Sequence, residues 1–261
     1  MNILFIGDVV GKPGRRMLRD YLDRIVDRES IDYAVANAEN AAGGFGITPE
    51  VAEELFSLGI HCLTSGNHIW DKREVFDYLQ GTPALLRPLN YPAECPGTGV
   101  HIGQTAAGTP VAVLNLMGRV FMPPCDDPFR RIDEELDRLA GRAKVIIVDM
   151  HGEATSEKIA IGWHLTGRVS MVLGTHTHVP TADERILGGH TAYLSDVGMT
   201  GPYDSIIGVV KEDILQRFRT GLPIRFRTAK RGRELHAAVV TVDEQSGKAA
   251  SISRIQVMGE D

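Results

Sequence analysis

Two histidines separated by one small residue, His176 and His178, stand in the segment GTHTH at residues 174–178. The segment follows the mostly apolar run Val169 to Leu173, which is typical of a buried strand. Residues i and i+2 of an extended segment point the same way. A tight turn led by glycine could therefore bring both imidazoles to adjacent ions. Because imidazole is a common metal ligand, this segment indicates a metal site.

Four other segments repeat the design of an apolar strand that stops at a donor residue. They are Ile3 to Gly7 before Asp8, Tyr33 to Ala38 before Glu39 and Asn40, Ile60 to Gly66 before Asn67 and His68, and Val145 to Met150 before His151. In open α/β sheets, ligands bind in the crevice beyond the carboxyl ends of the strands. We therefore expect the donors at all five strand ends to converge on one place.

The segments between these strands carry helical patterns. Apolar residues at helical spacing predict a helix at 14–28, and Pro13 suits its first turn. Further helices are predicted at 48–58, 71–79, 127–140, 156–165 and 209–221. In the 156–165 helix we expect Trp163 to be a core anchor, in preference to a platform on which a substrate stacks.

Additional strands are predicted outside the donor-bearing segments. One lies at 111–117, and two hairpins pair 185–187 with 191–194 and 235–242 with 251–257. Residues 81–110 are rich in Gly and Pro and predict a long excursion with one hairpin. The glycine-rich loop at 41–46 resembles a site wall more than a phosphate-binding P-loop, because the Lys-Ser/Thr ending is missing.

Length and composition indicate a globular protein. The chain has 261 residues, of which 43% are hydrophobic and 24% charged, so we expect one domain spanning residues 1–261. No apolar run approaches the roughly 18 to 20 residues of a membrane span, and the N-terminus lacks a signal pattern. These features predict a cytoplasmic protein without membrane contact. Cys62, Cys95 and Cys125 form no CxxC pair and are expected to be reduced thiols.

The charge balance bears on the choice of ligand. The formal net charge of -6 gives no global positive field of the kind that extended nucleic-acid binding needs. A small phosphorylated ligand is easier to reconcile with this charge. A local basic cluster is interpreted as a solvated loop; it comprises Arg225, Arg227, Lys230, Arg231 and Arg233.

The order of the donors resembles a known superfamily. Asp8, an acidic residue at 39, GNH at 66–68, His151 and HTH at 176–178 resemble the calcineurin-like metallophosphoesterases. More narrowly, GDVVG at 7–11, NAEN at 37–40, GTHTHV at 174–179 and DVGMTGP at 196–202 are similar to the bacterial YmdB-type phosphodiesterase subfamily. The resemblance covers nearly the whole chain. It implies an α/β fold in which a two-layer β-sandwich is flanked by helices, and a site for two metal ions.

The resemblance also implies a ligand set. Glu39 is expected to bridge the ions, with Asp8 and His178 on one ion and Asn67, His151 and His176 on the other. Two departures affect the first ion. The usual Asp-x-His motif has Val10 in place of histidine, and the usual second-motif aspartate is Glu39 followed by Asn40. In the subfamily Asn40 fills the vacancy through its side-chain oxygen. Imidazole with carboxylate and amide oxygen suits Fe, Mn or Zn better than Ca, with Fe our first choice.

Two cations about 3.5 to 4 Å apart can activate a bridging hydroxide and stabilise the entering and leaving oxygens of an in-line displacement. His68 follows the ligand Asn67 directly, so we expect its ring to face the substrate as general acid. Asp71 is expected either to orient His68 or to be a helix cap.

Each residue alone has a plainer interpretation. A lone Asp8 at a strand end could be an Asx turn or helix cap, Asn40 is a common loop residue, and a lone His151 could be a hydrogen-bonded surface histidine. Their joint occurrence in family order favours the metal site. The remaining histidines lack such a context and are interpreted as structural: His61, His101, His164, His190 and His236.

The resemblance implies a dinuclear metal phosphodiesterase acting on nucleotide phosphodiesters, with 2',3'- or 3',5'-cyclic nucleotides as the expected substrates. Two alternatives stay open. One is a phosphomonoesterase or nucleotidase, and the other is a non-hydrolytic regulator that senses a nucleotide or RNA. RNA contact and homo-oligomer formation are partner interactions that both remain open.

Overall fold

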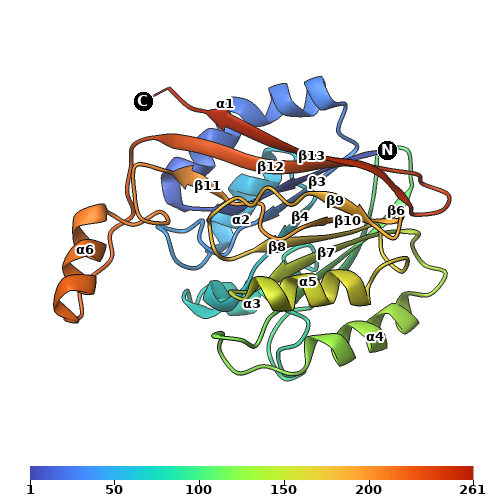
Figure 1. Cartoon of the computed structure of the whole chain (residues 1–261), viewed down its shortest axis with the longest axis horizontal. Helices are drawn as coiled ribbons and strands as arrows, with labels where there is room; N and C mark the ends of the chain where they lie inside the picture. The colour runs from blue at the N-terminus through green and yellow to red at the C-terminus, as the bar shows by residue number, and fades with distance from the viewer. Residues whose placement is uncertain (261) are drawn as a thin grey trace.

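The chain folds into two β-sheets packed face to face, as the computed structural model of residues 1–260 describes it (Figure 1). The strand order of the first sheet is β2 (Asp8–Val9), β11 (Met199–Pro202), β12 (Arg233–Val242), β1 (Asn2–Ile6), β3 (Tyr33–Asn37) and β4 (Cys62–Thr64), and β13 (Ala249–Met258) also pairs with β12. In this sheet β1, β3 and β4 run parallel, and β12 runs antiparallel to β1.

The second sheet has a parallel centre with one antiparallel strand at each edge. Strands β6, β7, β8 and β10 are mutually parallel, while β5 and β9 are antiparallel to their neighbours. The order is β5 (Val100–Gln104), β6 (Pro110–Met117), β7 (Val145–His151), β8 (Met171–Thr175), β10 (Thr191–Leu194) and β9 (Arg185–Leu187). The hairpins predicted at 185–194 and at 235–257 are confirmed. The hairpin predicted within 81–110 instead joins Val100–Gln104 to the strand that was predicted at 111–117.

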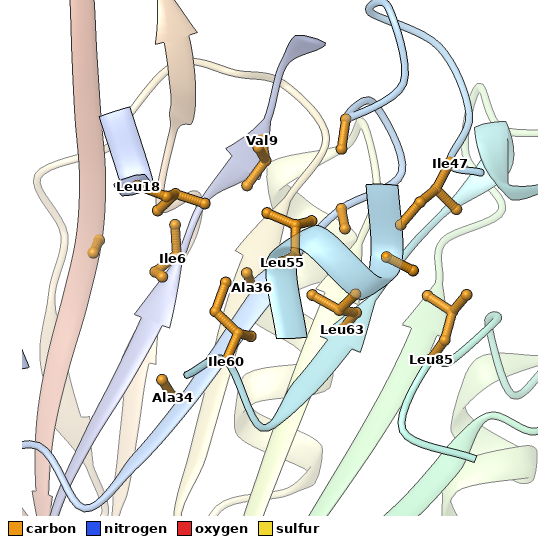
Figure 2. Close-up of a cluster of buried hydrophobic side chains, with 14 of the residues drawn as sticks. Ile6, Val9, Leu18, Ala34, Ala36, Ile47, Leu55, Ile60, Leu63 and Leu85 are labelled. Carbon is orange, nitrogen blue, oxygen red and sulfur yellow. The ribbon is translucent and has the colours of Figure 1, made fainter. Parts of the chain in front are cut away.

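Both faces of the central strands of each sheet are buried, which explains the continuous apolar runs in the sequence. In β1, Ile3 and Phe5 face the second sheet, while Leu4 and Ile6 face the helices. Alternation of side chains along a strand makes this division possible. Figure 2 shows the helix side of the first sheet, where Leu18 and Leu55 pack over Ile6.

Helices cover the outer faces of the sandwich, with α1 and α2 on one side and α4 and α5 on the other (Figure 1). The predicted helices are present as α1 (Gly11–Glu29), α2 (Pro49–Ser57), α3 (Val75–Gly81), α4 (Pro128–Leu139), α5 (Thr155–His164) and α6 (Lys211–Thr220). Thr48 caps α2 through Oγ1, which accepts the amide of Val51. The α/β sandwich flanked by helices is therefore confirmed.

Two local predictions were wrong. Trp163 is 58% exposed, because the buried face of α5 is formed by Lys158, Ile161 and Gly162, and Trp163 lies about 100° further round the helix. The helix predicted from residue 71 begins at Val75. Before it, the chain makes a 3₁₀ turn, η1 (Asn67–Trp70). Strands β2 and β11 were not predicted, since strands of two and four residues carry little periodicity.

The structure also bears on the cysteines and on membrane-spanning helices. Cys62, Cys95 and Cys125 are free thiols, as expected. Across residues 1–260, we find no helix with the length and apolar character needed to cross a membrane.

Helix α6 stands apart from both sheets at one end of the molecule (Figure 1). The segments on either side of it pair with each other, since Val210 donates to the carbonyl of Arg227 and Ala229 donates to that of Gly208. Arg227 also binds the Asp213 carboxylate of α6 at 2.6 and 2.9 Å. Arg225, Arg227, Lys230 and Arg231 are exposed, so the solvated interpretation of the basic cluster holds for these four, while Arg233 is half-buried.

Candidate metal centre

The seven residues expected to bind metal lie together at the carboxyl ends of strands from both sheets. The first sheet and its loops contribute Asp8, Glu39, Asn40 and Asn67, and the second contributes His151, His176 and His178. Convergence of the five strand ends was the central expectation from the sequence. The packing of the two sheets brings it about.

Glu39 commits one carboxylate oxygen to the protein and presents the other to the centre. Its Oε2 accepts the backbone N–H of His68 at 2.9 Å. Its Oε1 lies 3.1 Å from Nε2 of His151 and 3.4 Å from the amide nitrogen of Asn40. This oxygen therefore neighbours residues of both expected ion sites, which is the position a bridging carboxylate needs.

One group of donors surrounds Nε2 of His151. This nitrogen lies 3.2 Å from Oδ1 of Asn67 and 3.1 Å from Nδ1 of His176. Donors bound to one cation at roughly 2.0 to 2.2 Å lie about 3 to 3.5 Å from each other. The spacing of these atoms therefore fits a shared cation. The ligand atoms of Glu39, His151 and His176 all lie within 4.8 Å of one another.

The second group contains Asp8, Asn40 and His178. Oδ2 of Asp8 accepts the backbone N–H of His176 at 3.1 Å, while Oδ1 is buried without a hydrogen-bond partner among residues 1–260 and lies 3.6 Å from Nε2 of His178. Oδ1 of Asn40 is also buried and unpartnered in this part of the chain. Unsatisfied buried oxygens are costly. A cation bound here would satisfy both, so the residues fit a metal centre.

Hydrogen bonds set each histidine to offer one nitrogen to the centre. Nδ1 of His151 lies 2.9 Å from Oγ1 of Thr175, and Nδ1 of His178 donates to the carbonyl of Ile207 at 2.9 Å. Nε2 of His176 lies 3.2 Å from a carboxylate oxygen of Glu153. In each ring the opposite nitrogen faces the centre. Outer partners of this kind fix the tautomer and orientation of metal-binding imidazoles.

Sequence reasoning missed the residues behind the expected ligands. Asp149 is fully buried and accepts hydrogen bonds from Thr64 at 2.5 Å and Thr175 at 2.7 Å. Through Thr175 it supports His151. A charged residue inside a buried apolar strand was the available signal for Asp149, and a carboxylate two residues after His151 was the signal for Glu153.

The turn that carries His176 and His178 is conformationally strained. His176 and His178 have φ values of 98° and 65°, in the region that favours glycine. Between them, Thr177 donates its backbone N–H and its hydroxyl to one oxygen of Asp196, at 3.1 and 2.8 Å. The ammonium of Lys158 binds that same oxygen at 2.8 Å. A buried ion pair therefore holds the turn in place.

We expect Lys158→Met to lower the free energy of unfolding by about 3 to 5 kcal/mol, because it leaves the buried Asp196 carboxylate without its cation. Urea unfolding would measure the loss. The matched control is Lys211→Met, which removes an exposed pair with Asp204 and should have a much smaller effect on the free energy of unfolding. Equal effects of the two substitutions would contradict a supporting role for the buried pair.

Burial and neighbouring charges shift several pKa values in opposite directions. Burial opposes ionisation of Asp8, but the close contact with His178 and the charge of that ring outweigh it and lower the pKa of Asp8. Burial likewise opposes charge on His178, yet its contact with Asp8 raises the pKa of His178 to about 9. Burial and the charge of His151 lower the pKa of His176 to about 3. Burial raises the pKa of Asp149 to about 6.

Metal uptake by the metal-free protein near pH 7 should release a proton from His178 and none from His176. His178 is protonated at this pH because its pKa is about 9, and a nitrogen must lose its proton to bind a cation. His176 is already neutral because its pKa is about 3. Calorimetric titration with Mn²⁺ in buffers of different ionisation enthalpy counts the protons.

The control for this measurement is His178→Gln, which removes the titrating ring. It should lower the count by about one proton per chain. An unchanged count would show that His178 is neutral before metal binds.

His68 lies beside the donors without joining them. Its Nδ1 is 2.9 Å from Oδ2 of Asp71, so Asp71 orients the ring and the helix-cap alternative does not hold, since α3 begins later. The ring is 5.1 Å from that of Phe45, in edge-to-face geometry. His68 is only partly buried and lines the pocket above the centre. It can therefore reach a ligand held there.

Gly66 and Val10 also affect the shape of the centre. A Cβ atom on Gly66 would lie 2.1 Å from the His151 ring, so glycine is required where the chain passes this ligand. Val10, which replaces the usual histidine, is buried and packs near Gly201 and Gly208. Val10 contributes no donor. Asn40 lies beside His178, where a side chain that replaces the missing histidine ligand is expected.

A pocket of about 600 Å³ opens over the centre. Its floor includes Glu39, Asn40 and His178, and its far wall is formed by the α6 region. The five histidines interpreted as structural do not line it; His61, for example, stacks on Tyr33. A pocket of this size suits a small organic ligand.

Comparisons with known proteins agree with this architecture. The model of the family described as YmdB-like protein matches residues 4–255. A Bacillus subtilis protein named 2',3'-cyclic-nucleotide 2'-phosphodiesterase is 48% identical over 257 residues, covering 98% of this chain and 97% of its own.

Two solved structures also match over the whole chain. A protein of Thermus thermophilus superposes with a TM-score of 0.93 at 42% identity, covering 100% of both chains. A phosphatase of Mycoplasma pneumoniae gives a TM-score of 0.93 at 32% identity, covering 100% of this chain and 94% of its own. With the sequence order of the donors, their convergence and these matches in hand, we conclude that the chain belongs to the YmdB-like protein family.

Proposed function

We propose that the chain is a dinuclear metal-dependent phosphodiesterase that hydrolyses nucleotide phosphodiesters, with 2',3'-cyclic nucleotides as the preferred class. The observation that supports it best is Oε1 of Glu39, an oxygen flanked by two donor groups of which one contains the unpartnered Oδ1 of Asp8. Two cations held there, with iron our first choice and manganese or zinc as alternatives, would polarise the phosphate ester and lower the pKa of a water.

The residues of the chain supply the remaining functions. Glu39 and Asp8 are each held by a backbone N–H, so their free oxygens are positioned before a ligand arrives. The imidazoles are oriented by outer hydrogen bonds. His68, oriented by Asp71, is the group placed to give a proton to the departing alkoxide.

The substrate class is carried over from the Bacillus subtilis relative, whose name specifies cleavage on the 2' side of a 2',3'-cyclic nucleotide. In this reaction water adds to phosphorus, the P–O2' bond breaks, and O2' leaves as a hydroxyl. The product would be a 3'-nucleotide. His68 would protonate O2' in that step.

The test compares 2',3'-cyclic AMP, 3',5'-cyclic AMP and 3'-AMP as substrates for protein purified without oxygen and loaded with Fe²⁺ or Mn²⁺. We expect turnover of 2',3'-cyclic AMP to 3'-AMP. Preference for 3'-AMP would instead support a phosphomonoesterase, in line with the Mycoplasma phosphatase. Binding of cyclic AMP without turnover of any ester would support a non-hydrolytic sensor.

A further inference from the structure

The pocket over the centre has one polar end and one apolar end. The donor residues form the polar end. The opposite wall combines segments remote in sequence, and its side chains are mostly aliphatic or aromatic: Phe45, Ile207, Val209, Ile214, Phe218 and Phe226. The side chains of this wall offer no metal ligands, and its contribution to the donor end is the backbone carbonyl of Ile207, which accepts Nδ1–H of His178.

Aromatic and cationic groups follow one another along the wall, starting at His68. Phe45 touches His68 at a centroid distance of 5.1 Å, and Phe226 lies 6.4 Å beyond Phe45 with the two rings inclined by 26°. The guanidinium of Arg217 covers the Phe226 ring at 4.8 Å from its centroid. These separations fall in the range of stacking and cation–π contacts. Phe226 thus has support from α6 and remains only partly buried.

The segment carrying Phe226 is fixed to the rest of the wall. The neighbouring Arg227 makes its two hydrogen bonds to Asp213 of α6. Thr228, one residue further, donates its hydroxyl to the carbonyl of Gly43 at 2.7 Å, two residues before Phe45. The two phenylalanines are therefore held in a common frame although they belong to distant parts of the chain.

We propose that Phe45 and Phe226 form the nucleobase subsite of the enzyme, on which the base of the substrate stacks while its phosphate lies at the donor end. The inference rests on the proposed function and adds the group that recognises the nucleoside. A ligand whose leaving oxygen is at His68 has Phe45 as its next neighbour and Phe226 beyond it. Base stacking on aromatic side chains is a general mode of nucleotide binding.

The subsite has few means of reading base edges. Apart from Asn40, the neutral polar side chains that line the pocket are Thr177 and Thr228, and their hydroxyls already donate to Asp196 and Gly43, so that they can only accept from a base. Stacking accepts every base, because each has a π-face. We therefore expect the enzyme to act on 2',3'-cyclic nucleotides of all four bases, with purines favoured because they offer a larger stacking area.

The decisive experiment compares adenosine 2',3'-cyclic phosphate with ribose 2',3'-cyclic phosphate, which lacks the base. Phe226→Ala should lower kcat/KM for the nucleotide by roughly 5- to 150-fold, the range that loss of one stacked base corresponds to. It should leave kcat/KM for the base-free ester unchanged. Phe226→Tyr should restore the nucleotide rate, because the ring is retained.

Leu222→Ala is the matched control, since Leu222 is 59% exposed in the same segment and does not line the pocket. It should change neither rate. Equal losses of Phe226→Ala on both esters, or a parent enzyme with no preference for the nucleotide, would overturn the subsite. If the parent turns over neither ester, the proposed function fails. In that case the binding affinities of 3'-AMP and ribose 3-phosphate, measured by calorimetry for the parent and for Phe226→Ala, test the subsite independently of turnover.

Discussion

Glu39→Gln should reduce turnover of 2',3'-cyclic AMP by roughly 10³-fold or more, and it should reduce the bound metal as well. Loss of a residue that hydrogen-bonds to a metal ligand typically lowers metal affinity or activity by about 10- to 100-fold. The expected effect is larger for Glu39, because its Oε1 lies between both donor groups. A neutral amide cannot bridge two cations as a carboxylate does. Oxygen-free purification followed by metal analysis, together with the rate, measures both effects.

The control for the Glu39 variant is Glu94→Gln, an isosteric change at an exposed position. It should keep full metal content and rate. Thermal unfolding of metal-free samples would show whether Glu39→Gln alters the fold itself. Full metal content together with full activity in Glu39→Gln would assign the bridge to another residue.

His68→Ala should keep the bound metal and lower turnover of esters with poor leaving groups by roughly 10² to 10⁴-fold. The metal is retained because His68 lies outside the donor groups, although its backbone N–H, which the substitution leaves in place, holds Glu39. An alkoxide such as O2' needs a proton to depart. A nitrophenolate does not, so the rate on bis-p-nitrophenyl phosphate should fall much less.

A second variant separates proton donation from positioning by His68. Asp71→Asn would weaken the contact that orients the His68 ring at Nδ1, so it should lower turnover of 2',3'-cyclic AMP and change the rate on bis-p-nitrophenyl phosphate much less. Equal losses on poor and activated leaving groups in His68→Ala would mean that the residue positions the phosphate. An unaltered rate on both esters would remove it from the mechanism.

The strand pattern determined most of the fold and the identity of the donors. Apolar runs that stop at Asp8, Glu39, Asn67 and His151 place donors at strand ends, and parallel strands bring such ends to one edge. Helices α4 (Pro128–Leu139) and α6 (Lys211–Thr220) follow from apolar periodicity and from end signals, such as Asp127 before the first and Gly221 after the second. This information is local, so it can be read without knowing the packing.

The tertiary structure decided what depends on contacts between remote segments. The carboxylate of Asp149 reaches His151 through a threonine of another strand, and Glu153 meets His176 across a turn, so neither partnership has a local signature. Residue type alone assigns Trp163 to the core, but the ring of Tyr193 occupies the space next to Gly162 and sets the inward face of α5.

The pocket wall that carries Phe45 and Phe226 shows most clearly that local sequence patterns do not reveal contacts between remote segments. Phe45 follows β3 and Phe226 follows α6, and each alone has the sequence context of an ordinary loop residue. Hydrogen bonds from Thr228 to Gly43 and from Arg227 to Asp213 bring the two rings together. Periodicity records which face of an element is buried, but the pairing of two loops depends on the packing of the whole chain.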